Sequence, residues 1–517
     1  MKKESILQDQ SGLMNPEMDL ENYFAGFRKN IVGSKQVFES PFGPKEIFYA
    51  DWTASGRAYR PIEECMQNDL MPFLGNTHTE TTVTGSLMSG AYEKAKLIVK
   101  EHVRANKEDV LVFCGSGMTA AVNKLQRILG LRMPERAADY LKNSDEKWFS
   151  VDEQLRPVVF VTEMEHHSNQ ISWLETVAKV EIIPCDKNGN VDLEKFSYLL
   201  KKYTHCKNKI AAITACSNVT GIETPYHEIA KMIHIHRGLC FVDFAASAPY
   251  IDINMHPEEN GADLDAIYFS PHKFLGGPGA AGVLIFGRHI YKNKIPDQPG
   301  GGTVDYTNPW GVHEYIRNIE QREDGGTPPF LQGIKAAMCI RLKEAMGVQN
   351  ILAREEKILE HVFDRLSKMK QIEILEGPIK KRLGIISFIV SGAQYSLFVK
   401  MLNDRFGIQT RGGCSCAGTY GHFLLQIDET RSYEILKQIQ SGNLLCKPGW
   451  IRLSVHPTMT TAEVDFILDA IELTVAHYQK WKEDYLYDPA SNEYSFRGFV
   501  ATEKLRIEEW FSVDSWN

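Results

Sequence analysis

The stretch DAIYFSPHKFLGGPGAAGVLIF, residues 265–286, places a single lysine between two short apolar segments. The flanking runs 265–269 and 283–286 are rich in β-branched and aromatic residues and therefore predict two strands. Lys273 lies in the connection between them, where glycines permit positive φ angles and close approach of the backbone to a ligand. A turn of this composition holds its lysine in one place, so we expect a reactive amine rather than a solvated surface charge.

The neighbours of this lysine point to the kind of ligand. Ser270 and His272 can each donate a hydrogen bond. A desolvated lysine amine is a nucleophile toward aldehydes, and hydrogen-bond donors among glycines suit a phosphate group. The stretch therefore predicts a phosphorylated aldehyde held as a Schiff base on Lys273, with pyridoxal 5′-phosphate (PLP) as the leading candidate.

Strand and helix patterns alternate from about residue 90 to 290. Strand patterns occur at 110–113, 158–161, 180–183, 210–214 and 240–242, and helical patterns at 91–103, 119–129, 193–203 and 226–236. This alternation predicts βαβ units and a mostly parallel sheet. Ligands bind at the carboxyl ends of such strands, so we expect the chemistry to lie there.

The rest of the chain predicts three further parts around this α/β domain. A strand at 385–390 and a helix at 462–478 indicate a smaller α+β domain. Polar, weakly periodic stretches at 133–155 and 428–449 predict surface insertions. The expected parts are an N-terminal segment on the small domain (1–45), the large PLP-binding domain (46–334), the small domain (335–480) and a C-terminal extension (481–517).

Composition excludes several classes of protein. The 517 residues are 43% hydrophobic and 24% charged, as in globular chains, and the net charge of −8 argues against a nucleic-acid partner. Residues 1–22 lack the apolar centre of a signal peptide, and no apolar run is long enough for a membrane span. The ten cysteines are dispersed except for Cys414 and Cys416, which predicts reduced thiols and a cytoplasmic protein.

A second glycine-rich turn, CGSGMT at 114–119, follows the strand pattern at 110–113 and precedes a helix. Glycines before a helix N-terminus can form an anion site from backbone N–H groups and the helix dipole. The motif is neither the Rossmann nor the Walker pattern. On the residues alone, a phosphate site and a plain turn capped by Thr119 both remain open.

Polar residues also follow the next strands. His166 and His167 could ligate a metal, but no further group at metal spacing accompanies them, so no metal is predicted. An imidazole lying over an aromatic ring is the alternative. Asp243 lies between apolar residues and, when buried, needs a partner such as a pyridinium nitrogen. That pair is worth on the order of 4 kcal/mol, enough to keep the ring protonated as an electron sink.

Together these residues resemble the cysteine desulfurase and selenocysteine lyase family, within the class V aminotransferases of PLP fold type I. The likeness extends over about residues 45–480 and rests on an ordered set of motifs. They are GMT at 117–119, EHHSN at 165–169, SNVTG at 217–221, Asp243, SPHK at 270–273 and RGGCSCA at 411–417. The resemblance implies a large domain with a mostly parallel seven-stranded sheet and a smaller α+β domain.

The resemblance also implies roles. Lys273 corresponds to the Schiff-base lysine, His166 to the residue stacked on the PLP ring and Asp243 to the partner of its nitrogen, with Asn218 at the phenolate oxygen. Thr119, Ser270 and His272 correspond to phosphate ligands, with Thr327 donated across a homodimer interface, and Gly117 and Met118 are further cofactor-binding residues. Arg452 corresponds to the arginine that grips the substrate carboxylate, which suits a bidentate fork, and Arg411 assists it.

Cys416, five residues after Arg411, corresponds to the sulfur-accepting cysteine of the desulfurases. A thiol in a glycine-bounded loop beside a cation is expected to be accessible and nucleophilic. Cys414 leaves alternatives open: either thiol accepts sulfur, the two exchange sulfur, or they close a disulfide. Two incidental small residues in a turn are the structural alternative.

The expected reaction is removal of sulfur from L-cysteine to give alanine and an enzyme persulfide, with a protein as possible sulfur acceptor. One departure bears on this. Ala246 stands where desulfurases commonly have a glutamine that contacts the ring hydroxyl. The alternatives are therefore another class V reaction, by a selenocysteine lyase, other lyase, epimerase or aminotransferase, or a PLP-fold protein that acts only as a scaffold.

Overall fold

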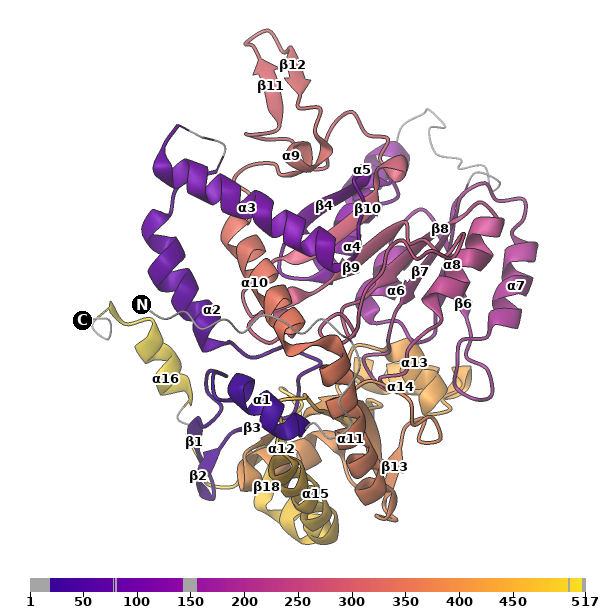
Figure 1. Ribbon diagram of the computed structural model, residues 1–517. Helices are drawn as coiled ribbons and strands as arrows, with labels where there is room; N and C mark the ends of the chain where they lie inside the picture. Colours follow the sequence, from indigo (N-terminus) through magenta and orange to yellow (C-terminus); the bar gives the residue numbers. More distant parts are fainter. Residues whose placement is uncertain (1–18, 78, 80, 143–155, 501–502, 514–517) are drawn as a thin grey trace.

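A seven-stranded sheet forms the centre of the molecule (Figure 1). The computed structural model describes residues 19–77, 79, 81–142, 156–500 and 503–513. The strand order is β4-β10-β9-β8-β7-β5-β6. The bounds are β4 (Asp109–Cys114), β5 (Val158–Thr162), β6 (Lys179–Ile183), β7 (Lys209–Thr214), β8 (Leu239–Asp243), β9 (Ala266–Phe269) and β10 (Gly282–Gly287).

The predicted mostly parallel sheet is confirmed. Strands β5 to β9 pair in parallel, and only β10 runs antiparallel to its neighbours β4 and β9. The reversal occurs at the short 3-10 turn η3 (Pro271–Lys273), in the connection that the sequence predicts. The lysine turn is therefore the point where the chain changes direction within the sheet.

Alternate residues of the sheet belong to two separate apolar clusters, one on each face. Ile267 and Ile285 lie in the larger cluster, whereas Tyr268 and Leu284 lie in the smaller one. Strands buried on both faces need helices on both sides, which explains their nearly continuous apolar sequences. The helices are α3 (Val83–His102), α4 (Met118–Ile128), α6 (His167–Leu174), α7 (Leu193–Lys202), α8 (Tyr226–Ile235) and α10 (Phe330–Met346), with α10 packed along α3.

A second, four-stranded antiparallel sheet, β13-β14-β17-β16, lies with its helices in the lower part of Figure 1. The strands are β13 (Ile372–Ile374), β14 (Ile385–Val390), β16 (Arg411–Gly413) and β17 (Trp450–Ser454). The helices are α11 (Val348–Ser367), α12 (Tyr395–Phe406) and α15 (Thr461–Trp481). The register of β16 and β17 places Arg411 directly opposite Arg452.

The N-terminal part of the chain crosses to this second sheet. Helix α1 (Leu20–Arg28) contacts α11, and Glu21 forms an ion pair with Arg354. Strand β3 (Phe48–Tyr49) pairs in parallel with β15 (Ile408–Gln409). The domain boundaries stay a prediction, and residues 1–18 of the predicted N-terminal segment lie outside the described residues.

The two predicted insertions contain helices. Helix α5 (Glu135–Lys142) lies in the first, whose residues 143–155 fall outside the described part. The second contains α14 (Glu429–Gln440) and η5 (Leu444–Cys446). The sequence showed no apolar stripe there because only Ile435 of α14 is buried. The Asp428 side chain caps the helix by accepting a hydrogen bond from Arg431 N, which supplies local stability without core burial.

The remaining elements frame the core. In the C-terminal extension, β18 (Tyr485–Asp488) and β19 (Glu493–Phe496) form a hairpin against α12, followed by α16 (Glu503–Trp510). The smaller elements are β1 (Val37–Ser40), β2 (Gly43–Glu46), α2 (Arg60–Glu64), η1 (Cys65–Leu70), η2 (Met71–Phe73), η4 (Arg288–Ile290), β11 (Val304–Thr307), β12 (His313–Tyr315), α9 (Ile319–Glu323), α13 (Gly418–Leu424) and η6 (Lys482–Asp484). In the described part of the chain, no helix is long and apolar enough to cross a membrane.

Candidate active site

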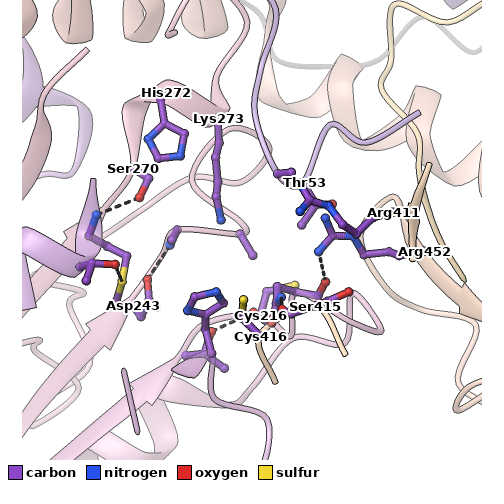
Figure 2. A pocket seen from close by; sticks show the side chains of 18 residues that line it. Thr53, Cys216, Asp243, Ser270, His272, Lys273, Arg411, Ser415, Cys416 and Arg452 are labelled. Atoms are coloured by element: carbon purple, nitrogen blue, oxygen red, sulfur yellow. Dashed lines mark hydrogen bonds between the residues drawn. The ribbon is translucent and has the colours of Figure 1, made fainter. Parts of the chain in front are cut away.

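A cavity of about 270 Å³ opens at the carboxyl ends of the central strands (Figure 2). Residues from both sheets line it, so the site lies where the large and small parts of the chain meet. The lining residues are Thr53, Ala54, Met118, Thr119, His166, Thr214, Cys216, Asn218, Asp243, Ala245, Ala246, Ser270, His272, Lys273, Arg411, Ser415, Cys416 and Arg452. Three predicted site residues, Gly117, Cys414 and Thr327, do not line it.

Lys273 enters this cavity from η3. The turn closes only because Gly277 has no side chain, since a Cβ there would overlap the carbonyl oxygen of Pro271. Burial lowers the pKa of Lys273 to about 8, with Asp243 opposing and Arg452 reinforcing the shift. No hydrogen bond from its Nζ occurs among the residues that the structure describes. The result is a buried amine with an appreciable neutral fraction near pH 7.

Asp243 is the last residue of β8 and is buried. Burial raises its pKa to about 6, while the Ala245 N–H and Lys273 favour the charged form. Its Oδ1 accepts the Ala245 N–H at 2.8 Å. Figure 2 shows Lys273 reaching into the space between Asp243 on one side and the two arginines on the other. A cationic ring nitrogen in that space would satisfy the buried carboxylate.

The paired histidines point to different tasks. His166 caps α6 and accepts the Ser168 N–H on Nδ1 at 3.1 Å, which leaves the proton of the neutral ring on Nε2. Burial, with Lys273 nearby, lowers its pKa to about 4, so the ring that lines the cavity is neutral. His167 instead accepts the Gly418 N–H at 2.9 Å and so holds the cysteine loop. Within the described residues, no cluster of three metal-ligating side chains occurs.

The start of α4 forms an open corner of the cavity. The helix has no side-chain cap at Gly117, and a Cβ there would lie 2.9 Å from Ser270 Oγ and 3.0 Å from His272 Cε1. Ser270 Oγ accepts the Met118 N–H at 2.9 Å, and Thr119 lines the space beside it. Gly117 therefore contributes by leaving room. Hydroxyl groups beside a helix N-terminus suit an anionic group.

The two site arginines share one carboxylate. Arg452 Nη2 donates to Asp51 Oδ1 at 2.7 Å, and Arg411 Nε donates to Asp51 Oδ2 at 3.0 Å. Arg452 also donates to Asn218 O at 3.0 Å, while its buried Nε has no partner among the described residues. Burial lowers the pKa of Arg452 and Asp51 opposes the shift. Sequence reasoning missed Asp51, because no local signal links residues 401 positions apart.

Residues 414–417 form a strained turn. Ala417 N donates to Cys414 O at 3.0 Å, and the two central residues, Ser415 and Cys416, have φ angles of +51° and +57°. Positive φ at both positions is typical of a type I′ turn, which normally selects glycine or asparagine. Asn218 Nδ2 holds Ser415 O at 2.8 Å, and His167 N holds Cys416 O at 2.7 Å. The strained residues are therefore fixed from the large domain's side.

The two cysteines of this turn face different surroundings. Cys416 is exposed and lines the cavity. Cys414 is half-buried, packs against the apolar core and lies outside the cavity lining. Of the two cysteines in the turn, Cys416 is therefore the one that shares a cavity with Lys273 and Arg452.

A second thiol in the cavity escaped sequence reasoning. Cys216 lies just after β7, next to the Ser217-Asn218 motif that could have drawn attention to it. Burial raises its pKa well above the usual value, so the thiol stays protonated and is a poor nucleophile. Ala246 lines the same cavity and offers no side-chain hydrogen bond.

Thr327 lies on the outside of its own chain. It is exposed, and its Oγ1 is 3.5 Å from Asn76 Oδ1. The loop that carries it is anchored by the buried Asp324, which accepts hydrogen bonds from Lys96 at 2.9 Å and Tyr92 at 3.1 Å. A rigid loop thus presents Thr327 at the surface.

Comparison with known proteins identifies similar chains. The profile of the family described as Aminotransferase class-V matches residues 151–467, more than half of the sequence. A "Probable cysteine desulfurase" of Halalkalibacterium halodurans is 28% identical over 387 residues, covering 74% of this chain and 86% of the relative. A protein of the same description from Staphylococcus epidermidis is 27% identical over 393 residues, covering 75% and 87%.

Solved structures share the fold. The apo cysteine desulfurase of Thermococcus onnurineus NA1 superimposes with a TM-score of 0.68 at 23% identity, covering 87% of this chain and 98% of that one. The cysteine desulfurase CsdA of Escherichia coli, in an S-sulfonic acid form, gives a TM-score of 0.66 at 20% identity, covering 88% and 98%. At these identities the likeness establishes the expected α/β fold, with a mostly parallel seven-stranded sheet flanked by helices.

Proposed function

The chain belongs to the class V aminotransferase family, and from that premise we propose that it is a PLP-dependent cysteine desulfurase. It removes sulfur from L-cysteine and leaves alanine and a persulfide on Cys416. The observation that carries this proposal is that Cys416, on a strained and fixed turn, lines the same cavity as Lys273 and Arg452. The desulfurase names of the relatives support it.

The cavity residues fit PLP. Lys273 offers a largely desolvated amine for the aldehyde, and His166 offers a neutral ring. Among the described residues, the Asp243 carboxylate has no cationic hydrogen-bond partner. The corner at α4, built around Gly117, fits the phosphate, with Thr119, Ser270 and His272 as its side-chain contacts. When bound, PLP supplies an electron sink that stabilises negative charge at the substrate Cα.

The arginines orient the substrate. Arg411 and Arg452 share the single carboxylate of Asp51, so a positive charge remains for the carboxylate of an amino acid. The orphaned Nε of Arg452 offers a donor for this purpose. Lys273, with a pKa of about 8, can take the Cα proton and return it near neutral pH.

Cys416 performs the step specific to sulfur removal. Its thiolate attacks the substrate sulfur; the new S–S bond forms as the bond from sulfur to Cβ breaks, and the carbon fragment keeps the electron pair. Protonation of that fragment gives alanine. Hydrogen bonds to the carbonyl oxygens of Ser415 and Cys416 hold the backbone of the nucleophile in one conformation. Less conformational entropy of this turn is therefore lost when the thiolate reaches the substrate.

Ala246 favours a second candidate, another class V reaction on selenocysteine or a different amino acid. It lines the cavity without offering a hydrogen bond, so the electronic tuning of the cofactor there differs from that expected for desulfurases. In that case Cys416 would not be needed for turnover. This distinguishes the two candidates.

Assembly and location are part of the proposal. The exposed Thr327, on its anchored loop, supports a homodimer in which it reaches the partner's phosphate site. All ten cysteines lie within the described residues and none forms a disulfide, which supports a reducing cytoplasm. The persulfide is expected to pass to an acceptor thiol, for which a protein is the candidate.

Product analysis tests the proposed reaction. PLP-loaded protein is incubated with L-cysteine, L-selenocysteine and L-alanine in turn, and the products are identified. The proposal expects alanine and protein-bound sulfane sulfur from L-cysteine. Pyruvate, an α-proton exchanged without sulfur release, or amino transfer to a keto acid would instead establish the second candidate.

A further inference from the structure

Cys414 is half-buried and does not line the cofactor cavity, so its thiol has surroundings of its own. Cys414, Tyr395 of α12 and Tyr494 of β19 all lie at the edge of the core, and Cys414 and Tyr494 are near enough to Tyr395 to raise its pKa. A Cβ on Gly412 would lie 3.2 Å from the Tyr395 ring, so glycine lets this ring lie close against the loop. We call these surroundings the outer thiol site, comprising Cys414, Tyr395, Gly449, Tyr487 and Tyr494.

The second insertion and the C-terminal extension both contribute to this site. Gly449, at the end of the insertion, closely approaches the loop: a Cβ there would lie 2.7 Å from Tyr395 Cε1 and 2.8 Å from Gly413 Cα. From the extension, Tyr487 and Tyr494 pair with ring centroids 5.1 Å apart, and β19 packs on α12. Two segments without a role in the cavity therefore converge on Tyr395 and on the loop that carries Cys414.

The tyrosines are suited to stabilise a sulfur anion. Burial raises the pKa of Tyr395, and the Cys414 thiol and neighbouring tyrosines raise it further, so its hydroxyl remains a donor at neutral pH. Burial also raises the pKa of Tyr494. Neither hydroxyl has a hydrogen-bond partner among the described residues. Hydrogen bonds to charged groups are stronger than those between neutral groups.

The turn brings the Cα atoms of Cys414 and Cys416 close together. They are its first and third residues, closed by the Ala417 N–H bond to Cys414 O. Successive Cα atoms are about 3.8 Å apart, so a tight turn places residues two apart within the roughly 4.4–6.8 Å range that S–S bonds span. The hydrogen bonds to the carbonyl oxygens of Ser415 and Cys416 hold this geometry despite the strain at the two residues.

We propose that Cys414 takes the sulfane sulfur from Cys416 and holds it in the outer thiol site, outside the cofactor cavity. The step rests on the proposed desulfurase function. The Cys414 thiolate attacks the outer sulfur of the Cys416 persulfide, an S–S bond forms at Cys414 and the one at Cys416 breaks. Cys416 leaves as a thiolate and takes the proton that Cys414 lost. No oxidant or reductant is consumed.

This transfer gives each thiol a distinct task. Cys416 returns to the cavity free for a second substrate molecule. The sulfur on Cys414 becomes available to an acceptor thiol that docks at the outer surface and never enters the cofactor cavity. The insertion and the extension, which build the site, then determine which acceptors reach it.

The first experiment follows sulfur through one turnover without reductant. PLP-loaded protein is mixed with sulfur-labelled L-cysteine, quenched with an alkylating reagent at increasing times and digested. Fragment ions that break the peptide at Ser415 separate a label on Cys414 from one on Cys416. The label should appear on Cys416 first and move to Cys414. A label that stays on Cys416 throughout would overturn the proposal.

Alanine counting gives a second readout. Two thiols that each hold one sulfur give a stoichiometric alanine burst about two-fold larger than one thiol does. Cys414→Ser should therefore halve the burst while leaving its rate unchanged. The matched control is Cys65→Ser, another half-buried thiol, on η1, which should keep the full burst. Equal bursts in wild type and C414S would contradict the transfer.

A cofactor-free experiment separates this proposal from the desulfurase function. Protein without PLP is treated with cysteine persulfide, and label on Cys414 is compared between wild type and Cys416→Ser. Transfer through Cys416 predicts faster labelling of Cys414 in wild type, even if the protein never produces alanine. Equal labelling in both, or release of sulfide with a Cys414–Cys416 disulfide, would overturn the transfer while leaving the desulfurase function intact.

Discussion

Arg452 and Asp51 are joined across 401 positions of sequence by a hydrogen-bonded ion pair of 2.7 Å. Only 4% of the Arg452 side chain and 12% of the Asp51 side chain are exposed, so solvent screens the pair weakly. The pair ties the start of the chain to β17 and fixes the arginine that faces the cavity. Positioning of the substrate carboxylate therefore depends on a residue outside every motif of the sequence.

Removing Asp51 should destabilise the protein. Asp51→Ala leaves the buried guanidinium of Arg452 without its carboxylate, and breaking such a pair typically costs about 3–5 kcal/mol. Urea denaturation measures the free energy of unfolding. The exposed pair of Arg431 and Glu434 provides the control, since Glu434→Ala should change stability by less than about 1 kcal/mol. Similar losses in both variants would contradict the importance of the buried pair.

Cofactor uptake should depend on the protonation of Lys273. Only the neutral amine attacks an aldehyde, and the folded protein holds the pKa of Lys273 at about 8. The rate at which cofactor-free protein acquires the visible absorbance of PLP should rise with pH and reach half its maximum near pH 8. A midpoint near the ordinary lysine value of 10.5 would show that burial does not tune this amine.

A side chain at Gly117 should weaken PLP binding. In Gly117→Ala the new methyl group meets Ser270 Oγ and His272 Cε1 at the corner that fits the phosphate. We expect the dissociation constant for PLP to rise by roughly ten-fold or more, about 1.4 kcal/mol, by fluorescence titration. Gly90→Ala, in helix α3 with no atom near the new Cβ, is the matched control and should bind PLP normally.

Stability should depend on pH through His234. A hydrogen bond to Asp265, at 2.8 Å from His234 Nε2, raises the pKa of this histidine despite its partial burial. A raised folded-state pKa gives stability that is complete below the unfolded value and lost as pH rises through the folded one. His234→Gln should therefore lose about 1 kcal/mol more at pH 5.5 than at pH 9. A loss independent of pH would mean that His234 is not charged in the folded protein.

Much of the fold followed from periodicity and turn chemistry. The apolar runs at 210–214 and 385–390 form β7 and β14, because strands that are buried on both faces need continuous apolar sequence. The predicted turn at Lys273 is present in the structure. It requires glycine at position 277, because a Cβ there would overlap the carbonyl oxygen of Pro271. The sequence did not predict helix α14. This helix lies on the surface and is stabilised by its N-cap, so its sequence has no apolar stripe.

The sequence predicted those site residues whose role follows from a single local motif. Lys273, His166 and Asp243 lie at the ends of elements that the sequence locates, and they meet in one cavity. The role of Asp51 could not be predicted, because an ion pair between residues far apart in sequence leaves no local sequence pattern. The direction in which Cys414 faces was equally hidden, because it depends on the φ angles of the turn and on segments far along the chain.

The central claim is that the Cys416 thiol removes the substrate sulfur. The most direct measurement is alanine formation from L-cysteine by Cys416→Ser, loaded with PLP and compared with wild type and Cys446→Ser. The account predicts that the C416S protein binds PLP, changes its visible spectrum on adding L-cysteine and forms no alanine, while Cys446→Ser matches wild type. Alanine formation by Cys416→Ser at the wild-type rate would contradict the account.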